Sequence, residues 1–184
     1  MDRRELIKKI AILTGAAFLG ADLFLVGCKS DKNINFALTD ITLLDEIAET
    51  IIPKTKTPGA KDAETGKFIA GYVADCYSDS DRKIVQEGVI ALEEAANRKY
   101  DGSFMEITKM QKQELLTAIA MEAKEYNQKK DKNKTVHYFT LIKQLTLLGF
   151  FTSEVGATQV LRYNPIPGKY EGCLPYIKGE KAWF

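Results

Sequence analysis

The chain has 184 residues, of which 45% are hydrophobic and 28% charged, a composition typical of a globular protein and not of a disordered chain. Its 26 basic and 25 acidic residues give a net charge of +1, and residues 1–28 hold four basic and three acidic groups, so the remainder carries 22 of each sign. Nucleic-acid binding needs a clustered excess of lysine and arginine, so this balance excludes nucleic acid as an expected partner.

Residues 1–27 have the organisation of an export signal. Arg3 and Arg4 lie in a polar start, and an apolar stretch with an internal aspartate follows from residue 10 to residue 27. A membrane-spanning helix needs about 20 apolar residues without a charge near its centre, so a signal peptide fits this stretch better. The arginine pair, followed by an apolar pair and a lysine, resembles a twin-arginine signal. A general secretory signal that starts with two arginines is the alternative.

The apolar stretch ends in the sequence LVGC at residues 25–28, which resembles a lipobox and predicts that Cys28 is acylated. Each buried methylene of an acyl chain contributes about 0.8 kcal/mol, so the several chains of a bacterial lipoprotein anchor it permanently. Residues 28–38 are then the lipidated cysteine and a polar tether, and residues 39–184 the folded domain. We expect a lipid-anchored protein on the periplasmic side of a bacterial membrane, and Lys29 after the cysteine favours the outer membrane. The alternative is a buried cysteine in a membrane-anchor helix.

Residues 39–151 carry the periodicity of helices, with apolar residues three and four positions apart. They show no alternation typical of strands and no repeat. Thr39 is a predicted N-cap, Pro53 ends the first helix, and Thr108 with Gln111 has the capping-box pattern. The expected helices cover residues 39–52, 62–77, 79–100, 108–126 and 136–151. The predicted fold class is therefore all-α: an irregular helical bundle of about five helices, followed by a C-terminal arm.

The last expected helix, residues 136–151, is apolar on more than one face, which is typical of a helix at the centre of a bundle. In the second helix, one apolar face is expected to point inward and includes Cys76. Phe104, in the link before the fourth helix, is expected to enter the core. The charged run at residues 127–134 is expected to be a solvated loop.

Residues 163–184 form the C-terminal arm, which is rich in proline, glycine and aromatic residues. Five of the 18 aromatic residues lie here, where an even spread would give about two. Proline prevents a regular helix or sheet, and each aromatic side chain can bury about 150–250 Å², so the arm is costly to leave in water. It either packs onto its own bundle or also reaches a partner protein. The predicted partner-contact residues are Phe150, Phe151, Tyr163, Tyr170, Tyr176, Trp183 and Phe184.

The sequence lacks the residue combinations of known catalytic, cofactor-binding and metal-binding motifs. The one histidine, His137, begins an apolar helix, where a polar or helix-capping role is more typical than a catalytic or ligand role. Glu154 is expected to make a helix-end hydrogen bond, the alternative being a functional carboxylate. We expect no catalytic, cofactor-binding or metal-binding residue, and no cofactor, in this chain.

Cys76 and Cys173 are the two cysteines outside the lipobox. In an oxidising compartment they could form a disulfide that joins the C-terminal arm to the second helix. Closing a loop of about 97 residues contributes roughly 4–5 kcal/mol by the chain-entropy treatment. Two separate thiols are the alternative.

Three blocks of sequence carry a family resemblance: IIP at residues 51–53 with TPGA at 57–60, LTLLGFFTSEVG at 145–156, and Tyr163 with PGKYEGC at 167–173 and PY at 175–176. Together they resemble the gluconate 2-dehydrogenase subunit 3 family, and the likeness runs from about Thr39 to Trp183. The resemblance implies a small subunit of membrane-bound dehydrogenases that oxidise gluconate or related sugars and polyols. It also implies FAD in a large flavoprotein subunit, where the chemistry takes place, and haem c in a cytochrome c subunit.

The leading hypothesis is therefore a non-catalytic accessory subunit that aids export, folding and anchoring of the flavoprotein. The twin-arginine route moves folded cargo, so a small subunit with this signal can carry a signal-less flavoprotein along. The lipobox is not the commonest form in the family and indicates that this copy anchors its complex directly. The alternative is a free-standing lipoprotein binding module without a dehydrogenase partner. An autonomous hydrolase or oxidoreductase is the weakest hypothesis, because no nucleophile–base pair is visible.

Overall fold

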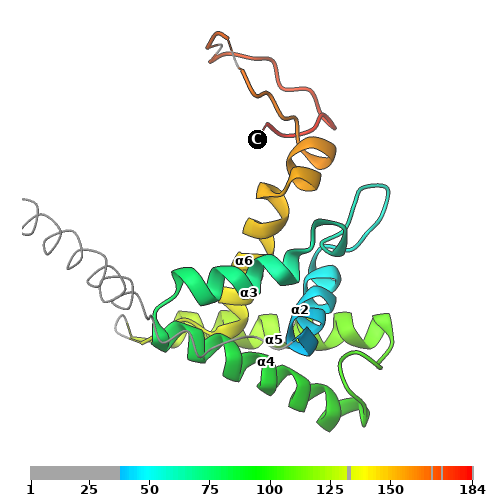
Figure 1. Cartoon of the computed structure of the whole chain (residues 1–184), viewed down its shortest axis with the longest axis vertical. Helices are drawn as coiled ribbons and strands as arrows, with labels where there is room; N and C mark the ends of the chain where they lie inside the picture. The colour runs from blue at the N-terminus through cyan, green and yellow to red at the C-terminus, as the bar shows by residue number, and fades with distance from the viewer. Residues whose placement is uncertain (1–37, 132–133, 167, 171, 184) are drawn as a thin grey trace, which may run out of the picture. The chain divides into compact units, whose positions relative to one another are not determined.

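The computed structural model describes residues 38–131, 134–166, 168–170 and 172–183, and over these residues the predicted all-α fold is confirmed (Figure 1). Five α-helices are described: α2 (Leu38–Ile51), α3 (Thr65–Cys76), α4 (Asp79–Tyr100), α5 (Lys109–Lys129) and α6 (Tyr138–Thr152). Two short turns accompany them, the 3-10 helix η1 (Lys61–Ala63) and the π-helical η2 (Gly156–Val160). The predicted export signal with Arg3 and Arg4, and the lipidated Cys28, lie outside the described residues.

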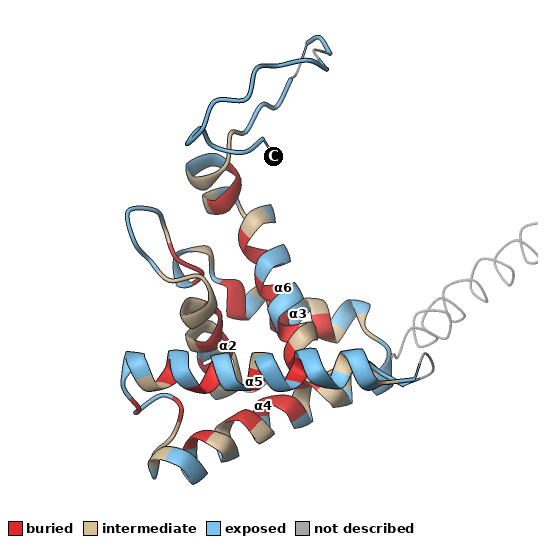
Figure 2. Ribbon diagram, turned by 180° about the vertical axis from the view of Figure 1, so that it is seen from behind, coloured by how far each residue is buried: buried red, intermediate tan, exposed pale blue. Residues whose placement is uncertain are grey.

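Helix α6 packs against all four other α-helices, as its apolar composition predicted (Figure 2). Phe139, Ile142 and Leu145 are buried along it and join one hydrophobic cluster with side chains from α2 to α5. Phe104, from the link between α4 and α5, is fully buried in the same cluster, which confirms its predicted place. The core is therefore organised around α6.

Helices α2 and α3 approach each other closely at Gly66. The Gly66 N–H donates to Asp45 Oδ1 at 2.6 Å, so the two helices share a hydrogen bond as well as apolar contacts. A Cβ atom at Gly66 would lie 2.6 Å from the Ile41 carbonyl oxygen and 2.6 Å from the Asp45 nitrogen. Only a residue without a side chain fits between the two backbones at this distance.

The second predicted helix differs from the observed one at both its start and its inward face. Residues 61–63 form η1, Glu64 adopts a left-handed conformation with φ of 48°, and α3 begins only at Thr65. The Thr65 hydroxyl donates to the Ala60 carbonyl at 2.8 Å, which favours this turn over a continuous helix. Cys76 is exposed at the end of α3, so its predicted inward position is wrong.

The helix ends follow local hydrogen bonding. The capping box at Thr108 is confirmed: its hydroxyl accepts from the Gln111 N–H, and the Gln111 side chain accepts from the Thr108 N–H. Helix α5 continues to Lys129, beyond its predicted end at residue 126. Helix α2 begins at Leu38, so Thr39 lies inside the first turn and is not the N-cap.

Hydrogen bonds between the end of α5 and the start of α6 explain why α5 extends beyond its predicted end at residue 126. The Asn127 side chain donates to the Thr140 hydroxyl at 2.8 Å and accepts from the His137 N–H at 3.1 Å. His137 is the N-cap of α6, because its Nδ1 accepts from the Phe139 N–H at 3.2 Å, which confirms the predicted capping role. The last turn of α5 is thus bonded to the first turn of α6.

Gly66→Ala and Gly71→Ala form a matched pair of substitutions in α3. A Cβ atom at Gly71 would meet no atom within 4 Å, so alanine there gains helix propensity and is expected to stabilise the fold by up to about 1 kcal/mol. Alanine at Gly66 forces the α2 backbone away and is expected to destabilise by about 1–3 kcal/mol. Denaturant unfolding of both variants measures the difference, and effects of the same sign would contradict the close approach of α2 and α3.

The stability of the fold should depend on the protonation of His137. Burial lowers the pKa of His137 below its ordinary value, against an opposing effect of Glu122. The folded state therefore favours neutral imidazole, and the stability from His137 is full above the unfolded pKa of about 6.5 and falls as pH drops through the folded pKa. His137→Asn keeps an N-cap acceptor without this titration. Melting temperatures measured below neutral pH should fall more steeply for the wild type than for this variant.

Candidate docking surface

Residues 53–60 join α2 to η1 and form a loop whose backbone is held by carboxylates. Glu49 Oε1 accepts from the Lys54 N–H at 2.8 Å, and Glu49 Oε2 accepts from the Lys61 N–H at 2.9 Å. The last turn of α2 therefore bonds both ends of the loop. Hydrogen bonds to a charged acceptor are stronger than neutral ones, so the loop has a defined shape.

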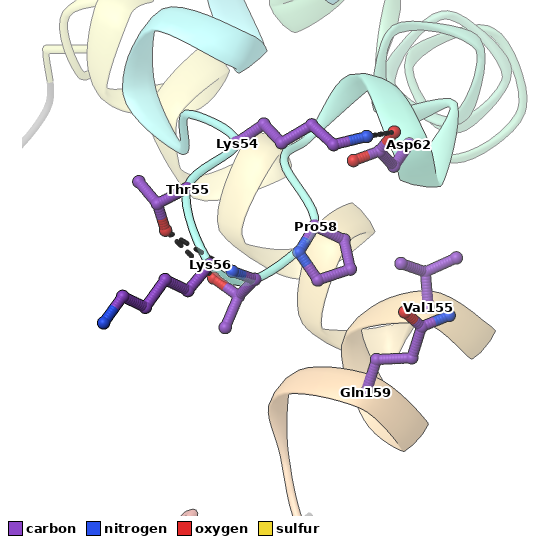
Figure 3. A pocket seen from close by; sticks show the side chains of 8 residues that line it. Lys54, Thr55, Lys56, Pro58, Asp62, Val155 and Gln159 are labelled. Carbon is purple, nitrogen blue, oxygen red and sulfur yellow. Dashed lines mark hydrogen bonds and ion pairs between the residues drawn. The ribbon is translucent and has the colours of Figure 1, made fainter.

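Asp62 holds the same loop from the η1 side (Figure 3). Its Oδ2 accepts from the Gly59 N–H at 2.9 Å, and its Oδ1 pairs with Lys54 Nζ at 2.9 Å. The hydrogen bond from Lys54 is the main cause that lowers the pKa of Asp62 below its ordinary value. The carboxylate is therefore ionised at neutral pH, when it accepts hydrogen bonds but has no proton to donate.

The turn after α6 depends on Ser153 and Gly156. The Ser153 hydroxyl donates to the Phe150 carbonyl at 2.7 Å and accepts from the Gly156 N–H at 2.9 Å. A Cβ atom at Gly156 would lie 2.0 Å from the Phe150 carbonyl oxygen, so glycine is required here. This contact directs the chain from α6 into η2.

Helix turn η2 and the loop at residues 53–60 line an open hollow of about 460 Å³ (Figure 3). The lining residues are Lys54, Thr55, Lys56, Thr57, Pro58, Asp62, Val155 and Gln159. The hollow thus brings together two of the sequence blocks that carry the family resemblance. Its lining offers ammonium, hydroxyl and amide groups, and its one carboxylate is already paired with Lys54. This chemistry suits polar contact with another molecule better than general acid–base catalysis.

A chain of ion pairs connects η1 to the core. Lys112, which is 8% exposed, places its Nζ 2.8 Å from Glu46 Oε1 and 3.2 Å from the Met105 carbonyl oxygen. Lys61 pairs with the other oxygen of Glu46. Burial raises the pKa of Glu46, but hydrogen bonds from Lys112 and Lys61 outweigh it, and the net pKa lies below the ordinary value. The ionised Glu46 therefore joins α2, α5 and η1.

The C-terminal arm leaves η2 and returns to it. The Arg162 N–H donates to the Ala182 carbonyl at 2.7 Å, and Arg162 pairs with Trp183 in an isolated parallel bridge. The Arg162 guanidinium lies 2.8 Å from the Glu180 carboxylate and 4.6 Å from the centroid of the Trp183 ring. Lys181 Nζ donates to the Gln159 carbonyl at 2.5 Å. The arm is therefore a loop whose base lies beside the hollow.

Between these ends, every described residue of the arm is exposed (Figure 2). Tyr170 is 95% exposed, Tyr176 is 89% exposed and Ile166 is 81% exposed. Of the two alternatives left open by the sequence, packing onto its own bundle is not what the arm does over its described residues. The side chains of Ile166, Tyr170 and Tyr176 are therefore accessible to another molecule.

Within the residues that the structure describes, no group of three or more histidine, cysteine, aspartate or glutamate side chains could hold a metal ion. No helix in the same segments is both long enough and apolar enough to cross a membrane.

A sequence profile of the family described as gluconate 2-dehydrogenase subunit 3 matches residues 39–168. The chain belongs to the gluconate 2-dehydrogenase subunit 3 family. No curated protein and no solved structure matches the chain. The match to the subunit 3 profile includes both segments that line the hollow and ends inside the C-terminal arm.

The predicted partner-contact residues of this subunit 3 family member differ in how far the structure exposes them. Phe150 is 1% exposed and packs with Phe151, their ring centroids 5.1 Å apart, so Phe150 is a core residue and its predicted contact role is wrong. Phe151 is partly exposed. Tyr163, Tyr170, Tyr176 and Trp183 are exposed on the arm, and Phe184 lies outside the described residues.

Of the two possibilities left open for Cys76 and Cys173, a disulfide or two separate thiols, the structure has two separate thiols. Cys76 and Cys173 are both free and both exposed. Glu154 is exposed as well, and the helix-end hydrogen bonds expected of it are made by the neighbouring Ser153 hydroxyl. The Glu154 carbonyl, not its carboxylate, accepts from the Thr158 hydroxyl at 2.6 Å.

Sequence reasoning missed the residues that hold this surface in place. Glu49 and Asp62 are ordinary charged residues in the sequence, and only the fold shows that they accept from backbone N–H groups of the loop. Arg162 directly precedes an arm with an excess of aromatic residues, and this position was the available signal that it contacts one of them.

Glu49→Ala should loosen the loop at residues 53–60 without unfolding the bundle. The substitution removes the acceptor of two backbone N–H groups, so we expect a loss of about 1–2 kcal/mol and faster amide exchange at Lys54 and Lys61. Glu87→Ala is the control, because its exposed carboxylate lies 3.7 Å from Lys83 on α4 and should contribute less than about 0.5 kcal/mol. Equal exchange rates in the two variants would show that Glu49 does not hold the loop.

Proposed function

We propose that this chain is a non-catalytic accessory subunit of a membrane-associated FAD-dependent dehydrogenase that oxidises gluconate or a related sugar or polyol. It assists the export, folding and anchoring of a large flavoprotein subunit, which binds FAD and carries out the oxidation. Membership of the subunit 3 family is the observation that carries the proposal, because the family is named for one subunit of a multi-subunit dehydrogenase. A cytochrome c subunit with haem c is a further candidate partner.

The geometry of the domain supports a role in binding a protein. The hollow beside η2 is open and lined mainly by polar groups, and the C-terminal arm, whose base bonds to Gln159 of the hollow, exposes tyrosine and isoleucine side chains. Protein interfaces combine apolar and aromatic side chains at their centre with a polar rim. The C-terminal arm supplies the exposed aromatic and apolar side chains, and the hollow supplies the polar groups.

The N-terminal sequence supports the export and anchoring parts of the proposal. Arg3 and Arg4 fit a twin-arginine signal, whose route carries folded cargo, and Cys28 fits an acylation site. A lipid-anchored subunit on the periplasmic side of the membrane, with the outer membrane favoured, would hold the flavoprotein at that surface without a spanning helix of its own.

Cys28→Ser should release the chain and a flavoprotein together from the membrane fraction. Without the acylated cysteine there are no acyl chains to bury in the bilayer. The test uses the full chain in its native host, with an affinity tag inserted after the exposed Asp131. Detergent-solubilised membranes are subjected to pull-down, and flavin and haem absorbance are read. Retention of a flavin-containing protein by the wild type supports the proposal, and a wild-type chain that purifies without one would favour the free-standing lipoprotein.

Two further variants complete this experiment. Cys76→Ser is the matched control, since this exposed thiol at the end of α3 lies outside both the lipobox and the C-terminal arm, and its loss should leave the membrane fraction unchanged. Arg3→Lys with Arg4→Lys keeps the positive charge of the signal, so general secretory export should survive and twin-arginine export should stop. Accumulation of the double variant inside the cell identifies the twin-arginine route, and normal export identifies the general one.

A further inference from the structure

The C-terminal arm is closed at its base and exposed along its length. Its base is closed by Arg162, through the Ala182 carbonyl, the Glu180 carboxylate and the Trp183 ring. Its apolar side chains, Ile166 and Tyr170 among them, are nevertheless left in water. Long loops without secondary structure in compact domains are usually functional, and closure before binding reduces the entropy lost on binding.

We propose that the C-terminal arm is a preorganised docking element that inserts Tyr170 and Tyr176 into an apolar groove, edged by carboxylates, on the large flavoprotein subunit. Arg162 is the positioning residue of this element. This inference rests on the proposed function and adds to it the segment that binds, the chemistry of the surface that receives it and the residue that keeps the segment in shape.

The charge of the arm favours a carboxylate-edged partner. Arg162 and the arm together hold four basic residues, Arg162, Lys169, Lys178 and Lys181, and two acidic residues, Glu171 and Glu180. Residues 39–161 hold 16 basic and 19 acidic residues, so the arm with Arg162 is net positive while the rest of the folded domain is net negative. Complementary charge around an apolar contact increases association rate and specificity.

The backbone of the arm argues against lipid as the occupant. Among its described residues, one backbone–backbone hydrogen bond lies inside the loop, from the Glu180 N–H to the Ile177 carbonyl. In hydrocarbon, each backbone polar group without a partner costs several kcal/mol. A protein groove can supply hydrogen-bond partners to such a backbone, and a bilayer core cannot.

The hollow beside η2 of a second copy of this chain is a poor fit for the arm. The hollow beside η2 carries Lys54 and Lys56, which have the same sign of charge as the lysines of the arm. Like charges brought together at an interface oppose binding. The large subunit is therefore the occupant to which the proposal commits.

The test measures binding of the purified large subunit to the mature, detergent-solubilised chain. Tyr170→Ser and Tyr176→Ser each remove an exposed aromatic side chain, so they should leave the melting temperature unchanged and weaken binding roughly 30-fold or more, as expected for central interface residues. Met110→Ser and Met121→Ser are matched controls, because these side chains are 81% and 60% exposed on α5 and should change affinity less than about twofold.

The positioning role of Arg162 has its own readout. Trp183 is the single tryptophan of the chain, and its ring lies under the Arg162 guanidinium, so its fluorescence reports closure of the arm. Arg162→Gln should shift the Trp183 emission to longer wavelength and weaken binding about tenfold, with helix content unchanged. Arg162→Lys keeps the positive charge, so its Trp183 emission and its binding affinity should both lie between those of Arg162→Gln and the wild type. A variant that alters the emission but binds normally would overturn the positioning role.

The remaining outcomes separate this inference from the proposed function. If the wild-type chain binds the large subunit and the tyrosine variants bind equally well, the inference is wrong and the proposed function stands. If the wild-type chain does not bind any flavoprotein, the proposed function fails. Quenching of Trp183 by brominated lipids in reconstituted vesicles, or a dimer that Tyr170→Ser dissociates, would identify lipid or a second copy as the occupant and overturn the inference.

Discussion

Glu46 is shared by two lysines that reach it from different parts of the chain. Lys112 comes from α5 and is almost fully buried, and Lys61 comes from η1 on the opposite side of the loop. Removing one partner of a buried pair leaves an uncompensated charge, which is strongly destabilising. Helices α2 and α5 and the turn η1 must therefore assemble together. The loop at residues 53–60 and the hollow that it lines take their position from this arrangement.

The two parts of the docking surface are stabilised in different ways. The loop at residues 53–60 is short, and carboxylates of α2 and η1 accept from its backbone, so it is an extension of the rigid bundle. The C-terminal arm is long and uncovered, and it depends on contacts at its base, most of them made by Arg162. A rigid polar hollow together with an exposed apolar loop can combine specificity with a large contact area. The arm follows the C-terminal end of α6, where the turn into η2 depends on Ser153 and Gly156.

Features that depend on near neighbours in the sequence were predictable, and features that depend on distant ones were not. The capping box of Thr108 and Gln111 spans three residues, and the bounds of α4 follow from its own periodicity. The sequence could not show which of Phe150 and Phe151 is buried. Helix α6 is apolar on several faces, and periodicity does not show which neighbour covers which side chain. The pairing of Arg162 with Trp183 is set by the return of the arm. Within the docking surface, the exposed tyrosines were predictable from the sequence. Glu49 and Asp62, which hold the backbone of the loop at residues 53–60, were not.

Because Trp183 follows all the described core helices in the sequence, the arm can close only after those helices have been synthesised. The α-helices that build the described core lie before residue 153, so the bundle does not need the closed arm in order to form. Arg162 emerges long before Glu180, Ala182 and Trp183, and it has no contact of the closed base to make until they follow. A chain that ends inside the arm would thus keep all the described core helices but lack the contacts that close the base of the arm. Only chains that have been translated through Trp183 can therefore have a closed arm.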